Sequence, residues 1–549
     1  MKSYRLIVDE NLTTKAFLLD SVGKYFDKTL DEIPLLKKKL SEVIFVKAEN
    51  NTEKFVVGFN NKTLTFSGSD RIVIYALFDF LEKLGWCFFA PDLEVRLINS
   101  SLSFNKAFSY SYEPAFEYRL NLWDCVTDEW AVKNGMNAFY GKTLPDNLGG
   151  SVGYAGAPVH TFNRLISAKE YFETNPEFFA IGKDGKRIKN QLCLSNEMLF
   201  DEIIKKAKQL LKDNPLATII SISQNDLVFT ECQCDNCKKI KGDGNASDVM
   251  IWFVNRVAEE LKKDYPNVKV QTLAYNYTVD APKYYKPSDN IIIELCPIES
   301  CENHAANDAT CWRNKKFVRQ ISDWNKATNN IYLWKYYKDF NYYLTPFQFL
   351  DNQRESFNFY AKNGVKGFFA EGSHCGKTTD FCELKAFVLA KLIFNPHMSE
   401  IEYRKHIKTF CMNFYGSYSG LYMIKYLKLL KTVSVNSHYD CYPAPYTVIP
   451  TNPKEPLNDK YFLKRAKNLF RKALLGAENE QYKNRIEKEF IAVLYFSLYT
   501  NFENEMINAN KAKRKKILEE QNLLFELIDK HGIKNVRSFN SGINVKKIL

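Results

Sequence analysis

Carboxyl and amide side chains stand at the ends of several apolar, strand-like segments of this 549-residue chain. Asn225 and Asp226 follow one such segment, Glu294 lies near the end of a second and Glu371 follows a third. Hydrolysis of an acetal needs a carboxylic acid that protonates the leaving oxygen and a second group that stabilises the charge developing on the sugar. If the fold brings these strand ends together, the chain holds the groups required for glycoside hydrolysis.

Side chains that suit a sugar ligand surround the same strand ends. Aromatic rings stack on the apolar faces of sugar rings, while Arg and Asn side chains hydrogen-bond to neighbouring hydroxyls. The candidates for substrate binding are Arg119, Asn121, Trp123, His160, Tyr275, Tyr277, Trp334, Tyr336 and Glu371. Each group also has an ordinary structural explanation, such as a turn cap for Asp226, a salt bridge for Glu371 and a core ring for Trp334.

Strand patterns alternate with helix patterns between Glu117 and Gly372. The eight predicted strands are Glu117–Trp123, Met136–Tyr140, Gln191–Leu194, Ala217–Ser223, Lys269–Asn276, Ile291–Cys296, Asn330–Tyr336 and Gly364–Ala370. This alternation predicts parallel pairing in an α/β fold, and eight units over this length are typical of a (β/α)8 TIM barrel of about 250 residues. An open doubly wound sheet is the main alternative, but no glycine-rich nucleotide loop follows any of these strands. Barrel active sites lie at the carboxyl ends of the strands.

Three domains are predicted. Residues 1–105 read as a small N-terminal α/β domain, and residues 110–430 contain the barrel. A Pro-rich segment, 442–456, then leads into a C-terminal helical region within residues 440–549.

Composition excludes several classes of protein. The chain is 45% hydrophobic and carries a formal net charge of +12, which is mild for its length and not focused enough to predict nucleic-acid binding. No apolar run is long enough to span a membrane.

Asp9 and Glu10 precede any apolar stretch, so we expect no signal peptide in this chain and a cytoplasmic location unless a leader was removed. We expect no cofactor.

The 13 cysteines include one cluster, Cys232, Cys234 and Cys237, directly after the segment that ends in Asp226. Cys296, Cys301, His304 and Cys311 follow the sixth predicted strand. We predict no metal site. A close Cys pair with distant Cys or His residues is also compatible with a structural zinc site, here Cys232, Cys234, Cys237 and Cys301, which stays open as an alternative. Disulfides and free thiols are the alternatives.

Several segments together resemble a bacterial family of carbohydrate-active proteins filed as a domain of unknown function and in part reclassified as glycoside hydrolase family 163. The matching segments are Leu81–Trp86, Phe89–Pro91, His160–Phe162, Tyr171–Phe179, Ser223–Asp226, Cys232–Cys237, Ala274–Thr278 and Gly364–Phe369. The resemblance implies a catalytic barrel preceded by an α/β domain like those before hexosaminidase and α-glucuronidase barrels. It also implies action on N-acetylglucosaminides, for example as an endo-β-N-acetylglucosaminidase.

The resemblance further implies roles for individual residues. In similar barrels the substrate's own 2-acetamido oxygen attacks C1, giving an oxazolinium intermediate and retention of configuration. Carried onto this sequence, Asp226 is the general acid/base, Asn225 holds the acetamide, and Tyr275 or Tyr277 donates to its oxygen. The commoner pair in those similar barrels is Asp-Glu or Asp-Asp, so the Asn-Asp pair leaves open that Glu371 or Glu294 is the acid, or that another sugar is cleaved.

Two alternatives to this function remain. An α-glucuronidase-like hydrolase would use two or more carboxylates and a basic residue such as Arg119 to bind a uronate. A non-catalytic glycan-binding protein would need Trp334 and the Tyr residues, while Asp226 would be dispensable. In every case the expected partner is an oligosaccharide or glycan.

Overall fold

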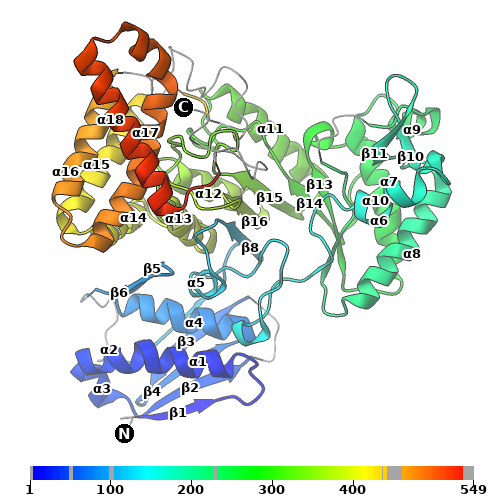
Figure 1. Cartoon of the computed structure of the whole chain (residues 1–549). Helices are drawn as coiled ribbons and strands as arrows, with labels where there is room; N and C mark the ends of the chain where they lie inside the picture. The colour runs from blue at the N-terminus through cyan, green and yellow to red at the C-terminus, as the bar shows by residue number, and fades with distance from the viewer. Residues whose placement is uncertain are drawn as a thin grey trace.

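The chain folds into an N-terminal α/β unit, a central parallel sheet covered by helices, and a C-terminal group of helices (Figure 1). The structure is a computed structural model that describes residues 4–48, 53–97, 104, 106–226, 231–435, 437–439, 441 and 460–535. The predicted Pro-rich linker, 442–456, lies outside these residues.

The N-terminal unit is built on a five-stranded sheet with the order β1-β2-β4-β3-β7. Its strands are β1 (Arg5–Val8), β2 (Glu42–Lys47), β3 (Phe55–Asn60), β4 (Thr63–Gly68) and β7 (Phe108–Tyr112). Helix α4 (Asp70–Lys83) packs on β3 and β4. The helical elements between β1 and β2 are α1 (Lys15–Ser21), the π-helix Val22–Phe26, α2 (Asp27–Glu32) and α3 (Pro34–Lys39). Because β7 pairs with β3, this sheet continues past residue 105, the predicted boundary.

The central sheet has seven strands, all paired in parallel, in the order β8-β16-β15-β14-β13-β12-β9. They are β8 (Tyr118–Leu122), β9 (Tyr154–Ala155), β12 (Ile219–Ser221), β13 (Lys269–Ala274), β14 (Ile291–Leu295), β15 (Ile331–Tyr336) and β16 (Val365–Glu371). The predicted parallel α/β architecture is therefore confirmed. A closed eight-stranded barrel is not, because no strand pairing joins β8 to β9 among the described residues.

Of the eight predicted strands, one is wrong and another lies outside the central sheet. Residues 136–140 form no strand, although the N–H groups of Asn137 and Ala138 donate to the Arg119 carbonyl and that of Val152 donates to the Asn137 carbonyl. An irregular segment thus lies between β8 and β9. The predicted strand Gln191–Leu194 overlaps β11 (Arg187–Leu192), which forms an antiparallel hairpin with β10 (Phe179–Ile181) outside the central sheet.

The two faces of the central sheet carry different side chains. One face gathers an aromatic cluster that includes Tyr118, Leu120, Tyr332, Trp334 and Phe369, and we call it the inner face. The other face belongs to the large core shared with the surrounding helices. These helices are α8 (Glu197–Asp213), α10 (Ala246–Lys262), α11 (Trp312–Ala327), α12 (Gln353–Lys362) and α13 (Cys382–Phe394).

Shorter elements connect these parts. They are the hairpin β5 (Trp86–Ala90) and β6 (Leu93–Arg96), and the helices α5 (Asp128–Lys133), α6 (Phe162–Leu165), α7 (Ala168–Tyr171) and α9 (Asp235–Lys241). Helices α6 and α7 and the β10–β11 hairpin fill the long insertion before α8.

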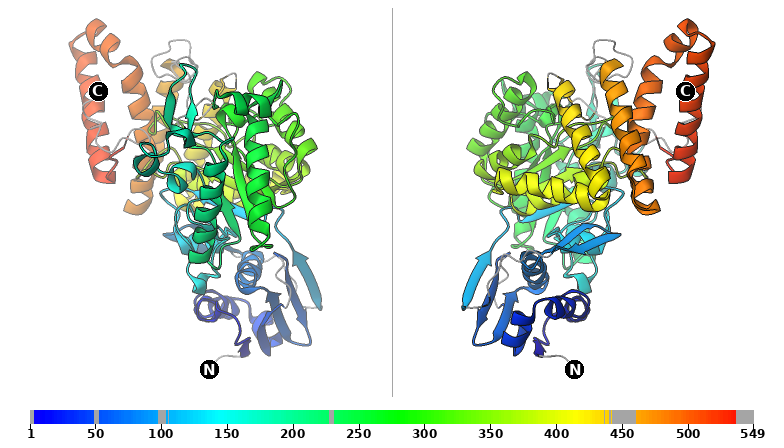
Figure 2. Two further views of the ribbon diagram at one scale, coloured as in Figure 1. Left: turned by 90° about the vertical axis from the view of Figure 1, so that its right-hand side faces the viewer. Right: turned by 90° about the vertical axis from the view of Figure 1, so that its left-hand side faces the viewer.

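The C-terminal helices lie beside the central sheet, on the side away from α8 and α10 (Figures 1 and 2). They are α14 (Glu400–Phe414), α15 (Ser417–Ser434), α16 (Lys460–Leu475), α17 (Glu480–Asn508) and α18 (Lys511–His531), and each contacts the next. Glu489 of α17 accepts a hydrogen bond from Tyr415 at 3.2 Å and also the N–H of Phe381, at the start of α13. None of the helices in the described part of the chain has the length and apolar composition that a membrane crossing requires.

Candidate active site

Glu371, the last residue of β16, is the carboxyl group at the centre of the site. Its Oε2 accepts a 2.8 Å hydrogen bond from the indole N–H of Trp334 on neighbouring β15, and only 9% of the residue is exposed. Burial raises the pKa of Glu371 to about 8; the Trp334 hydrogen bond opposes this shift and the charge of Asp226 adds to it. A carboxyl group held in its acid form at neutral pH is suited to donate a proton.

Asp226 supplies a second carboxyl group, in a different setting. It lies just beyond β12 and is exposed, and the phenol of Tyr275, next to the end of β13, donates a hydrogen bond to its Oδ1 at 3.3 Å. Asp226 is close enough to Glu371 to influence its pKa. Asp226 and Glu371, which follow or end different strands of the central sheet, therefore lie near each other, as the sequence predicts for residues at the carboxyl ends of parallel strands.

His160 extends this side of the site. Its ring lies 6.0 Å from that of Tyr275, and its Nδ1 is 2.9 Å from the carbonyl oxygen of Gln224. His160 adopts a left-handed backbone conformation, with φ of 54°, which is uncommon for residues other than glycine. His374 lies near the other carboxyl group, with Nδ1 3.6 Å from Glu371 Oε1. Burial lowers the pKa of His374, so its neutral form is favoured there.

An aromatic wall adjoins Glu371. The rings of Trp334 and Phe369 are 4.3 Å apart, and Tyr336 stacks on Trp334 at 5.9 Å. Tyr140 stacks on Phe369 at 5.9 Å and is 40% exposed, whereas Trp334 and Tyr336 are buried. Tyr140 is therefore the ring most accessible to a ligand. Tyr140 is not among the substrate-binding residues predicted from the sequence, although it ends the segment predicted as the second strand.

Asn225 has main-chain partners at both ends of its amide. Its Oδ1 accepts the N–H of Asn163 at 2.8 Å, and its Nδ2 donates to the carbonyl of Asn190 at 2.8 Å. Asn225 therefore ties the end of β12 to α6 and to the β10–β11 hairpin, directly beside Asp226. Tyr277 lies with the same hairpin, because its hydroxyl accepts a 2.6 Å hydrogen bond from Gln191.

Arg119, Asn121 and Trp123 were predicted to bind substrate, and the structure contradicts this. Arg119 is fully buried, forms an ion pair with Glu53 at 2.9 Å and donates to the carbonyls of Gly135 and Phe116. Asn121 donates to the Ala386 carbonyl of α13, and Trp123 belongs to the core shared with the helices. The three residues do share one face of β8, but it is the face that packs against the helices. The side chains of Tyr118 and Leu120 lie on the inner face instead.

Glu294 lies on the inner face as well, but it is 3% exposed and its Oε2 accepts a 2.5 Å hydrogen bond from Gln271. Burial raises the pKa of Glu294 to about 8. Its carboxyl group is thus neutral near pH 7 and enclosed by neighbouring strands, which fits a core hydrogen bond better than proton transfer to a ligand.

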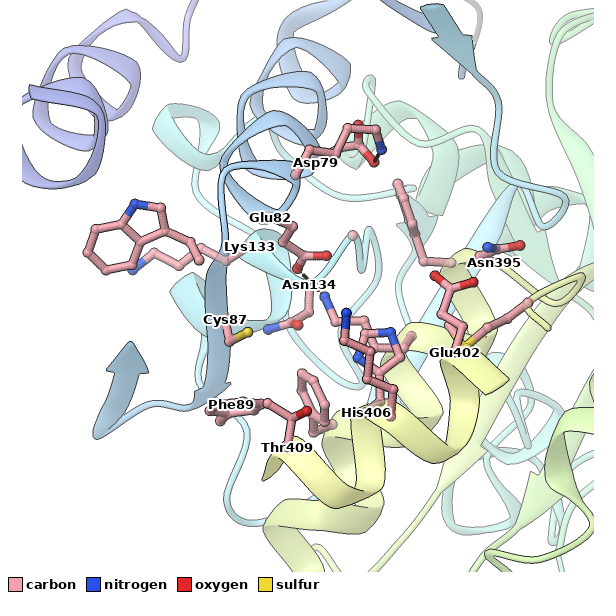
Figure 3. Close-up of a pocket in the computed structure, with 18 of the residues that line it drawn as sticks. Asp79, Glu82, Cys87, Phe89, Lys133, Asn134, Asn395, Glu402, His406 and Thr409 are labelled. Atoms are coloured by element: carbon pink, nitrogen blue, oxygen red, sulfur yellow. Dashed lines mark hydrogen bonds and ion pairs between the residues drawn. The ribbon is translucent and has the colours of Figure 1, made fainter. Parts of the chain in front are cut away.

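A separate cavity of about 460 Å³ lies between the N-terminal unit and helices α13 and α14 (Figure 3). Glu82, Cys87 and His406 line it, together with Lys391. Two of its carboxylates have lysine partners: Glu82 pairs with Lys391, and Asp79 pairs with Lys83 at 2.9 Å. Burial raises the pKa of Glu82 and the charge of Lys391 opposes this shift, so the carboxyl group of Glu82 differs from that of Glu371 in having a cationic partner.

Two groups of Cys and His side chains have the arrangement of metal ligands. Cys193, Cys232, Cys234 and Cys237 form one, and Cys301, His304, Cys311 and His438 form the other, with the ligand atoms of each group within 4.8 Å of one another. The alternative zinc set of Cys232, Cys234, Cys237 and Cys301 is thus corrected in its fourth member, which is Cys193. Cys301 follows β14 and belongs to the second group, whereas the fourth member of the first group, Cys193, directly follows β11.

With the geometry in place, the chain can be compared with known proteins. Residues 88–428 match the family described as Domain of unknown function (DUF4838). The chain belongs to this family. The DUF4838 region runs from β5 to α15 and contains Asp226, Tyr275, Trp334 and Glu371. The predicted membership of a domain-of-unknown-function family is confirmed, and the narrower relation to glycoside hydrolase family 163 stays a prediction.

Solved structures give distant resemblances to this DUF4838 chain. A GH89 enzyme from Clostridium perfringens in complex with its substrate GlcNAc-α-1,4-galactose has 12% identity and a TM-score of 0.47, covering 94% of this chain and 66% of the other. A GH138 enzyme targeting pectin rhamnogalacturonan II has 10% identity and a TM-score of 0.43, covering 96% and 74%. A β-N-acetylhexosaminidase from Bacteroides fragilis NCTC 9343 has 12% identity and a TM-score of 0.38, covering 74% and 90%. No curated protein matches the chain.

Proposed function

We propose that this DUF4838 protein is a glycoside hydrolase whose active site lies at the carboxyl end of the central sheet. The observation that carries the proposal is the unlike pair of carboxyl groups, a buried Glu371 hydrogen-bonded to Trp334 and an exposed Asp226 hydrogen-bonded to Tyr275. A carboxyl group whose pKa is raised toward neutrality by its surroundings, with a second carboxyl group nearby, is characteristic of acid–base catalysis.

Glu371 is proposed as the general acid. Its pKa of about 8 keeps the carboxyl group protonated at neutral pH, so it can deliver a proton to the glycosidic oxygen as the bond to C1 breaks. After the leaving group departs, the Glu371 carboxylate accepts a proton from the attacking water. This assignment takes up the alternative acid left open by the sequence and moves Asp226 to a different role.

Asp226 and Tyr275 are proposed to hold a 2-acetamido group. A carboxylate accepts a hydrogen bond from the acetamide N–H and a phenol donates one to the carbonyl oxygen. Held in this way, the carbonyl oxygen attacks C1 and forms an oxazolinium ion, which water opens with retention of configuration. The proposed substrate is therefore a glycan containing N-acetylglucosamine, with Tyr140 stacking on a sugar ring and Asn225 positioning Asp226.

The test combines a glycan-library digest, read by mass spectrometry, with aryl N-acetylglucosaminides. Cleavage beside N-acetylglucosamine supports the proposal, and Glu371→Gln is expected to spare substrates with a 4-nitrophenyl leaving group far more than natural glycans, because a good leaving group needs no proton. Asp226→Asn is expected to slow both. Glycan binding without any cleavage would overturn the enzyme assignment in favour of a binding protein. Release of glucuronate would overturn the substrate class.

A further inference from the structure

Four cysteine sulfurs converge next to the segment that carries Asp226. Cys193 follows β11, Cys232 and Cys234 precede α9, and Cys237 lies in its first turn. Cys193, Cys232 and Cys237 are buried and Cys234 is partly buried, and all four sulfurs lie within 4.8 Å of one another. Four thiols brought together from two separate parts of the chain, outside any regular sheet, form a cluster that hydrophobic packing alone does not require.

The spacing of the sulfurs fits a metal ion rather than a disulfide. Zinc–sulfur bonds of about 2.3 Å in a tetrahedron place the sulfurs about 3.8 Å apart, while a disulfide bond is about 2.05 Å long. The sulfurs of Cys193 and Cys234 are 3.6 Å apart. The sulfurs of Cys232 and Cys237 complete the group, and all 13 cysteines are free thiols in this structure.

Main-chain groups support the same interpretation. The N–H of Ile181, in β10, donates to Cys232 Sγ at 3.3 Å, and the N–H of Cys237 donates to Cys234 Sγ at 3.4 Å. Hydrogen bonds of this kind from outside the ligand shell orient metal-bound thiolates and balance part of their charge. The cluster thus has both its ligands and the groups that hold them.

The second cluster has independent geometry. Cys301 Sγ lies 3.2 Å from His304 Nδ1, and Cys311 Sγ lies 3.4 Å from His438 Nδ1. Zinc–sulfur and zinc–nitrogen bonds of about 2.3 and 2.0–2.1 Å give sulfur–nitrogen edges of about 3.6 Å in a tetrahedron. His304 Nε2 lies 3.1 Å from the Val435 carbonyl, so a proton on Nε2 leaves Nδ1 free to bind a metal.

We propose that the chain holds two structural Zn²⁺ ions, one bound by four cysteines and one by Cys301, His304, Cys311 and His438. Each set offers four protein ligands and leaves no open position, which is typical of structural rather than catalytic zinc. The four-cysteine site fastens the chain after Asp226 to the β10–β11 hairpin. The second site fastens the loop after β14 to the segment that follows α15. Neither depends on the proposed reaction.

The test is the metal content of the full-length protein, purified without metal-affinity chromatography and analysed by plasma mass spectrometry. Two zinc ions per chain are expected. Cys193→Ser and Cys237→Ser should each remove one equivalent, and Cys311→Ser and His438→Ala should remove the other. Cys87→Ser changes a cysteine outside both clusters and should retain two.

A second measurement covers variants that fail to fold. The native chain is titrated with a mercurial reagent while a metal-sensitive dye counts the zinc released, and 13 titratable thiols are counted after denaturation in the presence of a chelator. Release of two equivalents supports the proposal. Fewer than 13 thiols without zinc would show disulfides and overturn it, as would stoichiometric iron in place of zinc. Zinc content unchanged by the variants of one cluster would overturn that site.

Discussion

Glu371 and Glu82 are both carboxyl groups removed from water, but their surroundings differ. Glu371 meets an indole N–H, and its pKa is raised by burial and by the nearby Asp226. Glu82, at the cavity between the N-terminal unit and α14, meets the ammonium group of Lys391. Burial raises the pKa of both carboxyl groups, but at Glu82 the charge of Lys391 opposes the shift, whereas at Glu371 the nearby Asp226 adds to it. The two sites therefore differ in the partner of the carboxyl group, a cation at Glu82 and a neutral indole N–H at Glu371. Cavity size alone does not identify the site.

The largest expected effect comes from Glu371→Gln. Loss of general acid catalysis typically costs a factor of about 10²–10⁴, and we expect a decrease of about 10³ in kcat/KM on natural glycans. The matched change at the cavity, Glu82→Gln, should leave kcat/KM unchanged and lower the free energy of unfolding by about 1–2 kcal/mol, because Lys391 loses the carboxylate partner of a partly exposed ion pair. Equal loss of activity in both variants would contradict the comparison.

Asp226→Asn is expected to have the second largest effect, a decrease of about 10² in kcat/KM for N-acetylglucosaminides, because the acetamide loses an acceptor. The change also removes a negative charge that raises the pKa of Glu371. The wild-type rate should fall as the pH rises through about 8, where Glu371 loses its proton, and in Asp226→Asn this basic limb should lie at lower pH. If the basic limb of the pH–rate profile lies at the same pH in Asp226→Asn and in the wild type, the charge of Asp226 does not act on Glu371.

Glu371 should also make stability depend on pH. Its pKa is about 8 in the folded chain and near 4.5 when unfolded. Between pH 4.5 and pH 8 the folded state therefore binds more protons than the unfolded state, and the free energy of unfolding falls as the pH rises through this range. Because Gln stays neutral at every pH, Glu371→Gln avoids this decrease and is expected to raise the free energy of unfolding at pH 7 by on the order of 2 kcal/mol. Denaturant unfolding at pH 5 and pH 7 measures this, and the gain should be smaller at pH 5.

Tyr140→Ala tests the accessible ring of the aromatic wall. We expect KM to rise about fivefold with a smaller change in kcat, since stacking on one sugar ring contributes on the order of 1 kcal/mol. Phe369→Leu is a buried control on the same wall, and its effect should appear mainly in thermal unfolding. Unchanged KM in Tyr140→Ala would place the sugar elsewhere.

The smallest effect on activity is expected from Arg119→Met. Arg119 lies on the outer face and pairs with Glu53, so the change should lower the free energy of unfolding by about 3 kcal/mol and leave kcat/KM per folded molecule unchanged. A selective loss of activity on uronate-containing substrates would restore the role that the sequence suggested for Arg119.

The sequence predicted the later strands well, because each is a run of apolar β-branched or aromatic residues. The predicted Ile291–Cys296 corresponds to β14 at Ile291–Leu295, and Asn330–Tyr336 to β15 at Ile331–Tyr336. β9 has two residues, which is too short to give any periodic pattern. In β8, alternation was visible but its phase was not, because Tyr118 and Arg119 are both buried, on opposite faces.

The candidate site was predictable where polar residues follow apolar strands, as at Asp226 and Glu371. It was not predictable where the partner comes from far along the chain. Cys193 is 41 residues from Cys234, and His438 is 127 residues from Cys311. Only the folded topology, not spacing, pairs such residues.

The ion pair between Glu53 and Arg119 has a practical consequence for trimming this protein. Glu53 also pairs with Arg71 at 2.7 Å, and it lies before residue 88, where the family match begins. A fragment that begins at residue 88 would lack Glu53 and leave the guanidinium group of Arg119, in β8, buried without its carboxylate partner. Residues 1–87 thus contribute to the stability of the central sheet, and recombinant versions of the protein should retain them.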